Sequence, residues 1–415
     1  MKIIRLTPDA SGIVAWPTLS AAKKSVVTIG AFDGMHRGHQ AVIRRVAELA
    51  RKQRALSAVI LFDPRPSLVH AWAAAHDGAE PGEDVIDADA LTGADERIRI
   101  MRAMGVDYVL VVRYTLAFAA KSYRFFLGQM VGRLGMRTLV LGQDAAMGAG
   151  RAGDVKAIRT LAEGTGVFEL DVVDDRGPGY VRIPAVIEPH MPDGHGEPPD
   201  PFASMTKAEL RAWTKSHNTR LNRVWSSTNV RYLLSQGRIV AANDVLGRAH
   251  AVQGVVVHGE ERGRTIGFPT ANLGDAIEGY LPVDGVYAGW LVDMGPAGDG
   301  AEGAGEGADG DAHDDGLGAQ ARLAQGSPWR HPAAISIGTK PTFSERTGRH
   351  ERVVEAYAVT DDWLDLYGHT VRVEFAGYLR PQIRFAGADE LVAELKRNVE
   401  ETMRLTADAT PTTGR

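Results

Sequence analysis

The chain has 415 residues, too many for one hydrophobic core of ordinary size, so we expect about two or three domains. Hydrophobic residues at 44% and charged residues at 24% exclude a disordered or fibrous chain, and the net charge of -5 argues against binding along a nucleic-acid backbone. The lack of cysteine excludes a disulfide framework, a thiolate metal site and a cysteine nucleophile.

The first half of the chain alternates short apolar runs with amphipathic segments of helical length, which predicts an α/β domain with a parallel sheet. After the first run, Ile43, Val46, Leu49 and Ala50 recur at helical spacing in a segment that starts just after Gly38. The amino end of this predicted helix therefore faces a glycine-rich turn. The predicted strands are Val26 to Ile29, Ala58 to Phe62, Tyr108 to Val112, Thr138 to Leu141 and Val167 to Val173.

The turn before this helix combines glycines with two histidines, in the sequence IGAFDGMHRGH. Glycines allow close backbone approach, and the helix start offers free amides and a positive dipole end to a phosphate. His36 and His39 can donate hydrogen bonds where charge builds on a leaving pyrophosphate. A histidine pair is usually just polar loop, but a pair flanking Gly38 directly after a strand is the HxGH pattern of nucleotidyltransferases. The residues expected to contact ATP phosphates here are Gly30, Phe32, Asp33, Gly34 and Gly38.

A second element of this kind lies far downstream, in the sequence WSSTNVR from Trp225 to Arg231. Ser227 and Thr228 resemble a helix cap, and Arg231 follows on the first turns, where it can reach a polyphosphate. Alone, the segment predicts only a helix start. It also resembles the SSTxxR element of the same nucleotidyltransferase superfamily.

Together with FDPRP at Phe62 to Pro66, the segment Leu91 to Val112, and RAGD at Arg151 to Asp154, these elements resemble prokaryotic FAD synthetases. The resemblance implies that the phosphate of FMN attacks the α-phosphorus of ATP, while Mg²⁺ screens the triphosphate. It also implies that the triphosphate is held by His36, His39, Ser227, Thr228 and Arg231.

Three residues depart from the family pattern. Ala146 and Met147 stand where the family carries aromatic residues after the fourth strand, and Arg65 stands where histidine is common. One alternative is therefore an active kinase whose adenylyltransferase domain is impaired or acts on another phosphate acceptor.

From about Ala251 the sequence becomes β-rich and is punctuated by Gly and Pro, which predicts an antiparallel barrel or sandwich. The end is expected to be helical, because Leu391, Val392, Leu395 and Val399 form one apolar stripe. The predicted strands are Val255 to Val257, Val286 to Val292, Ala333 to Ile337, Val353 to Tyr357 and Val371 to Phe375.

The second dense motif is HGEERGRTIGFPTAN, which ends at Asn272. Its glycines can cover ATP phosphates and its arginines add positive charge, while Thr270 and Asn272 offer the oxygen ligands that Mg²⁺ prefers. A glycine-rich hairpin is the ordinary interpretation, but the whole string resembles the riboflavin kinase motif. The resemblance implies Mg²⁺ binding by Thr270 and Asn272 and ATP binding by Gly259, Arg264, Gly267 and Pro269.

Further segments continue this resemblance to the end of the chain and assign two roles. Glu355, in VVEAYAV, is implied to be the general base that takes the proton from the ribityl hydroxyl of riboflavin. Arg380, in LRPQIRF, is implied to lie at the flavin site. Without the resemblance, both would be interpreted as exposed charged residues.

The resemblance implies an α/β Rossmann-like nucleotidyltransferase domain followed by an antiparallel β-barrel riboflavin kinase domain with a C-terminal helix. Three segments are expected to be surface loops, the last largely disordered: Ala74 to Ala90, Pro189 to Pro201 and Gly295 to Gly326. The expected divisions are 1–188 for FMN adenylyl transfer, 189–224 for a proline-rich linker, 225–244 for a helical segment completing the first site, 245–406 for the kinase and 407–415 for a tail.

The leading hypothesis is a bifunctional riboflavin kinase and FAD synthetase that uses Mg²⁺ and takes ATP, riboflavin and FMN as substrates. A second alternative is a regulator that binds flavin and nucleotide without turnover, against which the retained Glu355, Thr270, Asn272, His36 and His39 argue. We expect a cytoplasmic protein with no nucleic-acid or membrane partner, since no segment resembles a signal peptide or reaches membrane-spanning length. A homo-oligomer is left open.

Overall fold

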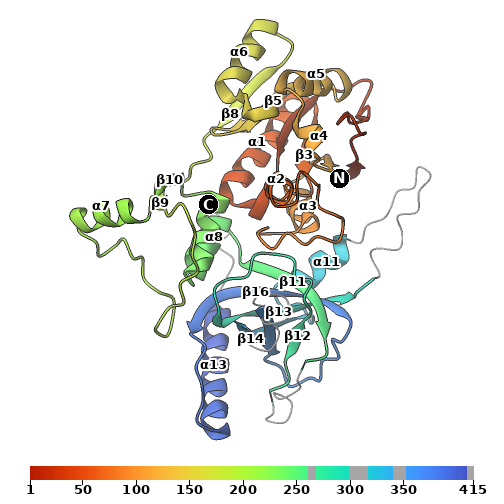
Figure 1. The fold of residues 1–415 in the computed structure, drawn as a ribbon. Helices are drawn as coiled ribbons and strands as arrows, with labels where there is room; N and C mark the ends of the chain where they lie inside the picture. Colours follow the sequence, from red (N-terminus) through yellow and green to blue (C-terminus); the bar gives the residue numbers. More distant parts are fainter. Residues whose placement is uncertain (260–267, 299–315, 340–351, 409–415) are drawn as a thin grey trace. The chain divides into compact units, whose positions relative to one another are not determined.

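The computed structural model describes residues 1–259, 268–298, 316–339 and 352–408 (Figure 1). Two compact units divide the chain. The first comprises Met1–Val181 together with Arg223–Ser227, and the second comprises Arg182–Asn222 together with Thr228–Arg415. The first unit is therefore discontinuous in sequence.

The first unit is built on a parallel sheet of six strands in the order β1-β4-β3-β2-β5-β8. All five predicted strands are confirmed, with ends that differ by up to two residues. The edge strand β1 was missed because its sequence, KIIRL, carries two cations and is only partly buried. The strands are β1 (Lys2–Leu6), β2 (Ser25–Gly30), β3 (Leu56–Phe62), β4 (Tyr108–Val112), β5 (Met136–Gly142) and β8 (Glu169–Val173).

Helices cover both faces of this sheet. One face packs against α1 through Ile43 and against α3 through Ile98 and Met101, and the other packs against α5 and α6. The apolar positions predicted to form one side of α1 are buried, which accounts for its helical period. The helices are α1 (Arg37–Gln53), α2 (Pro66–Ala75), α3 (Ala94–Ala103), α4 (Leu116–Ala119), α5 (Tyr123–Arg133) and α6 (Val155–Thr165).

The strand order reverses beside β2. From β2 the chain adds β3 and β4 on one side, and then places β5 and β8 on the other. In an open parallel sheet, ligands bind outside the carboxyl ends of the strands at such a reversal. The glycine-rich turn that follows Gly30, the last residue of β2, lies at this point.

The second unit contains a closed antiparallel barrel in the order β11-β12-β15-β14-β13-β16, which confirms the expected barrel (Figure 1). Five of its strands were predicted, whereas β12 was missed because it has only three residues. The strands are β11 (His250–Val257), β12 (Ala271–Leu273), β13 (Gly285–Pro296), β14 (Arg330–Thr339), β15 (Arg352–Ala358) and β16 (His369–Arg380).

The predicted terminal helix is confirmed as α13 (Ala388–Asp408), which packs on β13, β14 and β16. Its most buried face is polar: Glu394, Asn398 and Thr402 are each at most 5% exposed, whereas the apolar stripe is only half-buried beside them. Two further helices, α8 (Ser227–Ser235) and α9 (Ile239–Leu246), precede the barrel.

The three segments expected to be surface loops make more contacts than their composition suggested. The carboxylate of Glu197 accepts hydrogen bonds from the N–H groups of Val240 and Ala241 at the start of α9. Part of the third segment forms α11 (Gly316–Leu323), and Arg322 there stacks over the Trp329 ring at 4.7 Å. Residues 180–223 add β9 (Tyr180–Ile183), α7 (Lys207–Ser216) and β10 (Arg220–Arg223).

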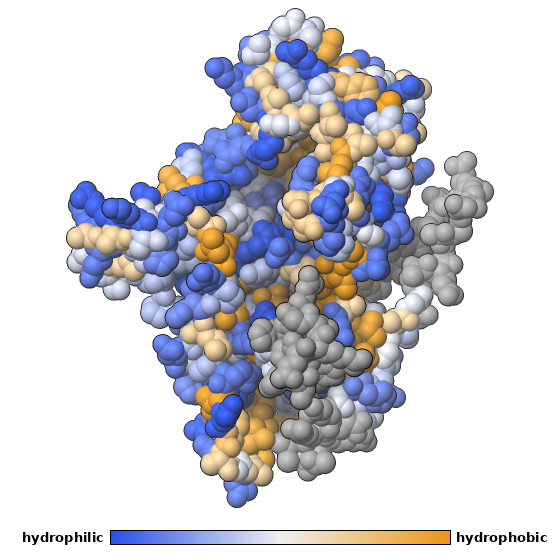
Figure 2. Space-filling model, in the orientation of Figure 1, coloured by the Kyte–Doolittle hydropathy of each residue, from blue (hydrophilic) through white to orange (hydrophobic). Residues whose placement is uncertain are grey.

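On the face shown in Figure 2, hydrophilic residues predominate and apolar residues are scattered among them. Among the described residues, no helix combines the length and apolar character needed to span a bilayer.

Candidate active sites

The turn between β2 and α1 has a strained and crowded backbone. Phe32 has φ 47° and Gly34 has φ 74°, and a Cβ on Gly34 would lie 2.6 Å from Leu91 Cδ1. A Cβ on Gly38 would lie 2.7 Å from the carbonyl oxygen of Asp175. Two of the predicted glycines are therefore required sterically, and their surroundings fix the path of the turn.

The two predicted histidines are in contact at the start of α1. Their rings stack with centroids 3.6 Å apart, and the N–H of His39 donates to Nδ1 of His36 at 3.3 Å. This bond needs a lone pair on Nδ1, so the neutral His36 ring carries its proton on Nε2 and can donate from there. The first turn of α1 has no acidic residue, which leaves its amino end suited to an anion.

Asp33 joins this turn to the second predicted element. It is 5% exposed, and its backbone carbonyl accepts a hydrogen bond from Ser227 Oγ at 2.9 Å. Its Oδ1 accepts from the N–H of Leu91 at 2.8 Å. Residues that lie 194 positions apart are thus joined directly. Thr228 and Arg231 lie on the following turns of α8, in the part of the chain assigned to the second unit.

Sequence reasoning missed an ion-pair cluster at the carboxyl ends of β5 and β8. Arg223 donates from Nη1 to Asp175 and forms an ion pair with Asp144 through Nε at 2.9 Å. Asp175 also accepts from the N–H of Gln143 at 3.2 Å, and its backbone lies against Gly38. No motif predicted this cluster, because its members come from three separate segments.

Ala146 and Met147, which differ from the family pattern, form the short strand β6. This strand pairs with β7 (Gly153–Asp154). Met147 is half-buried and packs against the core between the sheet and α5 and α6. An apolar side chain therefore takes up packing space beside the RAGD segment, where the family pattern has aromatic residues.

The barrel of the second unit contains a cavity of about 410 Å³. Its lining includes aromatic residues such as Trp363. It also includes four of the predicted site residues: Gly259, Pro269, Thr270 and Asn272. A Cβ on Gly259 would lie 2.5 Å from Asn272 Cγ, so glycine lets the main chain pass over this side chain. Arg264 and Gly267 lie outside the described residues.

Asn272 has the geometry of a ligand to a hard cation. Its Nδ2 donates to Thr270 O at 3.2 Å and is 3.4 Å from Thr270 Oγ1, which fixes the orientation of the amide. Its Oδ1 is buried and has no hydrogen-bond partner among the described residues. A buried amide oxygen left without a partner costs free energy, so this atom fits a site completed by a bound group.

Glu355 lies directly opposite Asn272 in the β12–β15 pair and opposite Ser336 in the β14–β15 pair. Opposed residues on antiparallel strands point to the same face, with Cβ atoms about 5 Å apart. The structure thus brings the predicted base beside the predicted magnesium ligand. The side chain is half-buried.

Arg380 is buried rather than exposed. Its Nε lies 2.9 Å from Glu394 Oε1 and donates to Asn398 Oδ1 at 3.2 Å, so it joins β16 to α13. Burial lowers the pKa of Arg380, and the nearby Glu394 carboxylate acts in the opposite direction. Its guanidinium lies 5.6 Å from the centre of the Phe385 ring.

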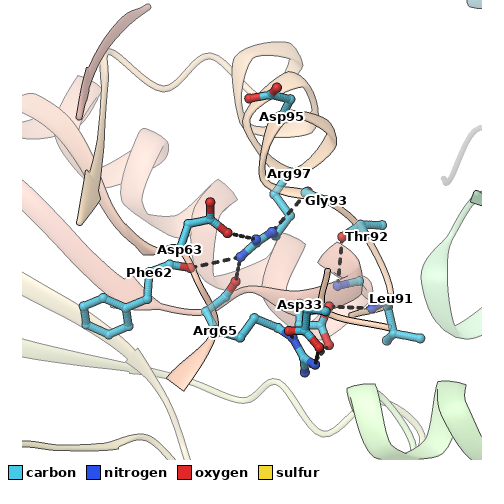
Figure 3. A network of polar contacts seen from close by, with 12 residues as sticks. Asp33, Phe62, Asp63, Arg65, Leu91, Thr92, Gly93, Asp95 and Arg97 are labelled. Carbon is cyan, nitrogen blue, oxygen red and sulfur yellow. Dashed lines mark hydrogen bonds and ion pairs between the residues drawn. The ribbon is translucent and has the colours of Figure 1, made fainter. Parts of the chain in front are cut away.

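A second missed cluster surrounds Arg97, which is 1% exposed (Figure 3). This side chain donates to the carbonyls of Ala31 at 2.7 Å and Phe62 at 3.2 Å, and it pairs with Asp63 at 3.0 Å. It therefore fixes the backbone where β2 and β3 end. The sequence around Arg97 gave no sign of this role.

Comparison with known proteins gives the same two-part division. The family model for FAD synthetase matches residues 18–184, and the one for riboflavin kinase matches residues 246–406. A solved structure titled as a macrolide-efflux protein from Streptococcus pneumoniae aligns with TM-score 0.64 and 23% identity, covering 96% of this chain and 99% of that one. At this identity, it supports the fold alone.

Curated relatives extend the likeness along the chain. The bifunctional riboflavin kinase/FMN adenylyltransferase of Escherichia coli (strain K12) is 30% identical over 374 residues, which is 90% of either chain. The protein of the same name from Bacillus subtilis (strain 168) is 27% identical over 92% of either chain. The chain therefore belongs to the bifunctional riboflavin kinase/FMN adenylyltransferase family.

Proposed function

We propose that the barrel phosphorylates riboflavin to FMN and that the parallel-sheet unit adenylylates FMN to FAD, each with its own ATP. The observation that carries this is the presence in one chain of two features. One is an HxGH turn at the reversal of a parallel sheet, and the other is Asn272, which lines a barrel cavity and lies opposite Glu355 in the β12–β15 pair. The phosphorylation releases ADP, and the adenylylation releases pyrophosphate. Phosphorylation breaks the bond between the γ-phosphorus of ATP and its bridging oxygen. Adenylyl transfer breaks the corresponding bond at the α-phosphorus.

In adenylyl transfer, a phosphate oxygen of FMN attacks the α-phosphorus of ATP, and the bond to the pyrophosphate oxygen breaks. His36 Nε2–H and the positive dipole end of α1 are proposed to stabilise the negative charge of the leaving group. Ser227, Thr228 and Arg231 are proposed to hold the same triphosphate. Positioning and charge stabilisation suffice, without a covalent intermediate.

His39→Ala should lower FAD formation from supplied FMN by about 10²- to 10³-fold, because it removes one preorganised donor at the leaving phosphates. Riboflavin phosphorylation by the same variant should stay at the wild-type rate, which provides an internal control for folding. Initial rates of FAD and FMN formation measure the two steps separately. Normal FAD formation by this variant would remove the proposed role of His39.

In riboflavin phosphorylation, Glu355 takes the proton of the ribityl hydroxyl as its oxygen attacks the γ-phosphorus, and ADP leaves. Thr270 and Asn272 are proposed to hold Mg²⁺, which screens phosphate charge when bound. The partnerless Oδ1 of Asn272 among the described residues supports this assignment. Gly259, Arg264, Gly267 and Pro269 are proposed ATP contacts, and Arg380 is proposed to shape the flavin site.

Asn272→Ala should raise the Mg²⁺ concentration needed for half-maximal FMN formation by on the order of 10-fold, because one oxygen ligand is lost. The Mg²⁺ dependence of FAD formation from supplied FMN should be unchanged. Thr270→Val provides a matched variant that removes the other oxygen while keeping the side-chain shape. An unaltered Mg²⁺ requirement in both variants would exclude this pair as ligands.

The wild-type chain incubated with riboflavin, ATP and Mg²⁺ tests both steps when FMN, FAD, ADP and pyrophosphate are each quantified. We expect one ADP for every riboflavin consumed and one pyrophosphate for every FAD formed. FMN without FAD or pyrophosphate would favour an impaired or differently specific first unit.

We also propose the division into 1–188, 189–224, 225–244, 245–406 and 407–415 as the functional limits of the chain. Support comes from Ser227, which contacts Asp33 although it lies beyond the linker. A cytoplasmic location is proposed because the cysteine-free composition suits a reducing compartment.

A further inference from the structure

A buried cation, Arg65, lies beside the proposed phosphate-binding turn (Figure 3). Its Nη1 is 3.2 Å from Asp33 Oδ2, and the two side chains are 8% and 7% exposed. On its other edge, Arg65 forms a two-pronged contact with Asp87, with Nε and Nη2 each 2.6 Å from a carboxylate oxygen. The segment that composition predicted to be a surface loop therefore supplies a partner to this arginine.

The cluster keeps Arg65 charged in spite of its burial. Burial lowers the pKa of Arg65, but hydrogen bonding to Asp87 and the charge of Asp33 outweigh it, so the net pKa is raised. A buried ion pair is costly to break on one side only, because the remaining charge is left without compensation. Without Arg65, the Asp33 carboxylate would lose a buried cation that lies 3.2 Å from its Oδ2.

Asp33 links Arg65 to groups proposed to act on ATP. One carboxylate oxygen faces Arg65 and the other accepts the N–H of Leu91, while the carbonyl of the same residue accepts Ser227 Oγ. The position of Asp33 thus determines where Ser227 is held. Loss of the Arg65 charge would also make the surroundings of a bound polyphosphate more negative, and this effect is strong where water is excluded.

Arg65 and Arg97 act on different groups. Arg97 donates mainly to backbone carbonyls and to Asp63, so it fixes the strand ends. Arg65 contacts the side chain of Asp33 itself. Asp87 instead contacts the other edge of the Arg65 guanidinium.

We propose that Arg65 is a positioning residue for adenylyl transfer, which acts through Asp33 to orient Ser227 and to neutralise a carboxylate beside the ATP phosphates. This inference rests on the proposed adenylyltransferase function of the first unit. Asp87 is an anchor for Arg65 with no part of its own in the reaction.

The test compares Arg65→Met with Asp87→Asn. Both variants lose the two-pronged ion pair, but only Arg65→Met removes the cation from Asp33. Arg65→Met should raise the KM for ATP in FAD formation by about 10- to 100-fold, as expected for a lost hydrogen bond between charged groups. Its KM for FMN should remain close to wild type. Asp87→Asn should keep both KM values close to wild type, and both variants should show a lowered Tm.

Riboflavin phosphorylation by each variant, measured in the same preparations, reports on the integrity of the second unit and should be unchanged. Equal increases in the KM for ATP in both variants would show that Arg65 only anchors the loop, and would overturn the inference. An unchanged KM for ATP in Arg65→Met would also overturn it. Failure of the wild-type chain to form FAD would instead refute the function on which the inference rests.

Discussion

Glu355→Gln should lower FMN formation from riboflavin by about 10²- to 10⁴-fold, because glutamine cannot accept the proton of the ribityl hydroxyl. Glutamine has nearly the same shape, so the strand pairs that place residue 355 opposite Asn272 and Ser336 should be kept. The defect should therefore appear mainly in kcat for riboflavin phosphorylation, with a smaller effect on the KM for ATP.

The measurement is the initial rate of ADP and FMN formation, with adenylylation of supplied FMN as the control reaction. The control should proceed at the wild-type rate, since Glu355 belongs to the barrel unit. Equal loss of both reactions would contradict the assignment of the two steps to separate units. A kinase rate within a few-fold of wild type would exclude Glu355 as the base.

Glu374→Gln should lower the free energy of unfolding of the barrel by about 3–5 kcal/mol, because it removes the charge shared by the buried Arg372 and the half-buried Arg330. Glu374 accepts from Arg372 at 2.8 Å and from Arg330 at 2.9 Å, and it is 8% exposed. Arg330 also lies 4.0 Å over the Trp290 ring, where it cannot readily turn to water. Loss of kinase activity in rising urea measures this unfolding, with adenylyl transfer followed in parallel.

A matched control for this change is Glu401→Gln, which removes an exposed pair with Arg404 on α13. An exposed pair contributes only about 0–1 kcal/mol, so its urea midpoint should barely move. Similar shifts in both variants would show that the Glu374 cluster has no special role.

The effect of Glu374 should also depend on pH. Burial raises the pKa of Glu374, but Arg372 and Arg330 outweigh burial, so the net pKa is lowered on folding. The stability from this carboxylate is therefore complete above the unfolded pKa of about 4.3 and is lost as pH falls through the lower folded value. The difference between wild type and Glu374→Gln should accordingly shrink in acid.

The sequence predicted elements whose evidence lies within one segment. Short apolar runs identified the buried strands, and glycine spacing located both turns, because local backbone needs determine these patterns. Two short or half-exposed strands, β1 and β12, escaped because their side-chain patterns are weak. Strands with a clear local side-chain pattern were therefore predicted, and strands with a weak pattern were not.

Relations between distant segments could not be predicted in this way. The opposition of Glu355 and Asn272 depends on strand register, and the Arg65 cluster joins three segments of the first unit. The polar face of α13 was hidden for another reason: Glu394 is buried because Arg380 supplies its counter-charge from another element. In each case, the contacting residue in another segment determines where the side chain lies, and the local sequence does not.

Because Arg223–Ser227 belongs to the first unit, a shortened chain that stops at residue 188 would not be an intact adenylyltransferase. It would lose the guanidinium that pairs with the buried Asp175, the indole of Trp225 that covers Gly177, and the hydroxyl of Ser227 on Asp33. To separate the two activities, residues Arg223–Ser227 must therefore be joined to the fragment that carries the first unit. Cutting at the proline-rich linker alone would yield a truncated first unit with a buried, unneutralised carboxylate.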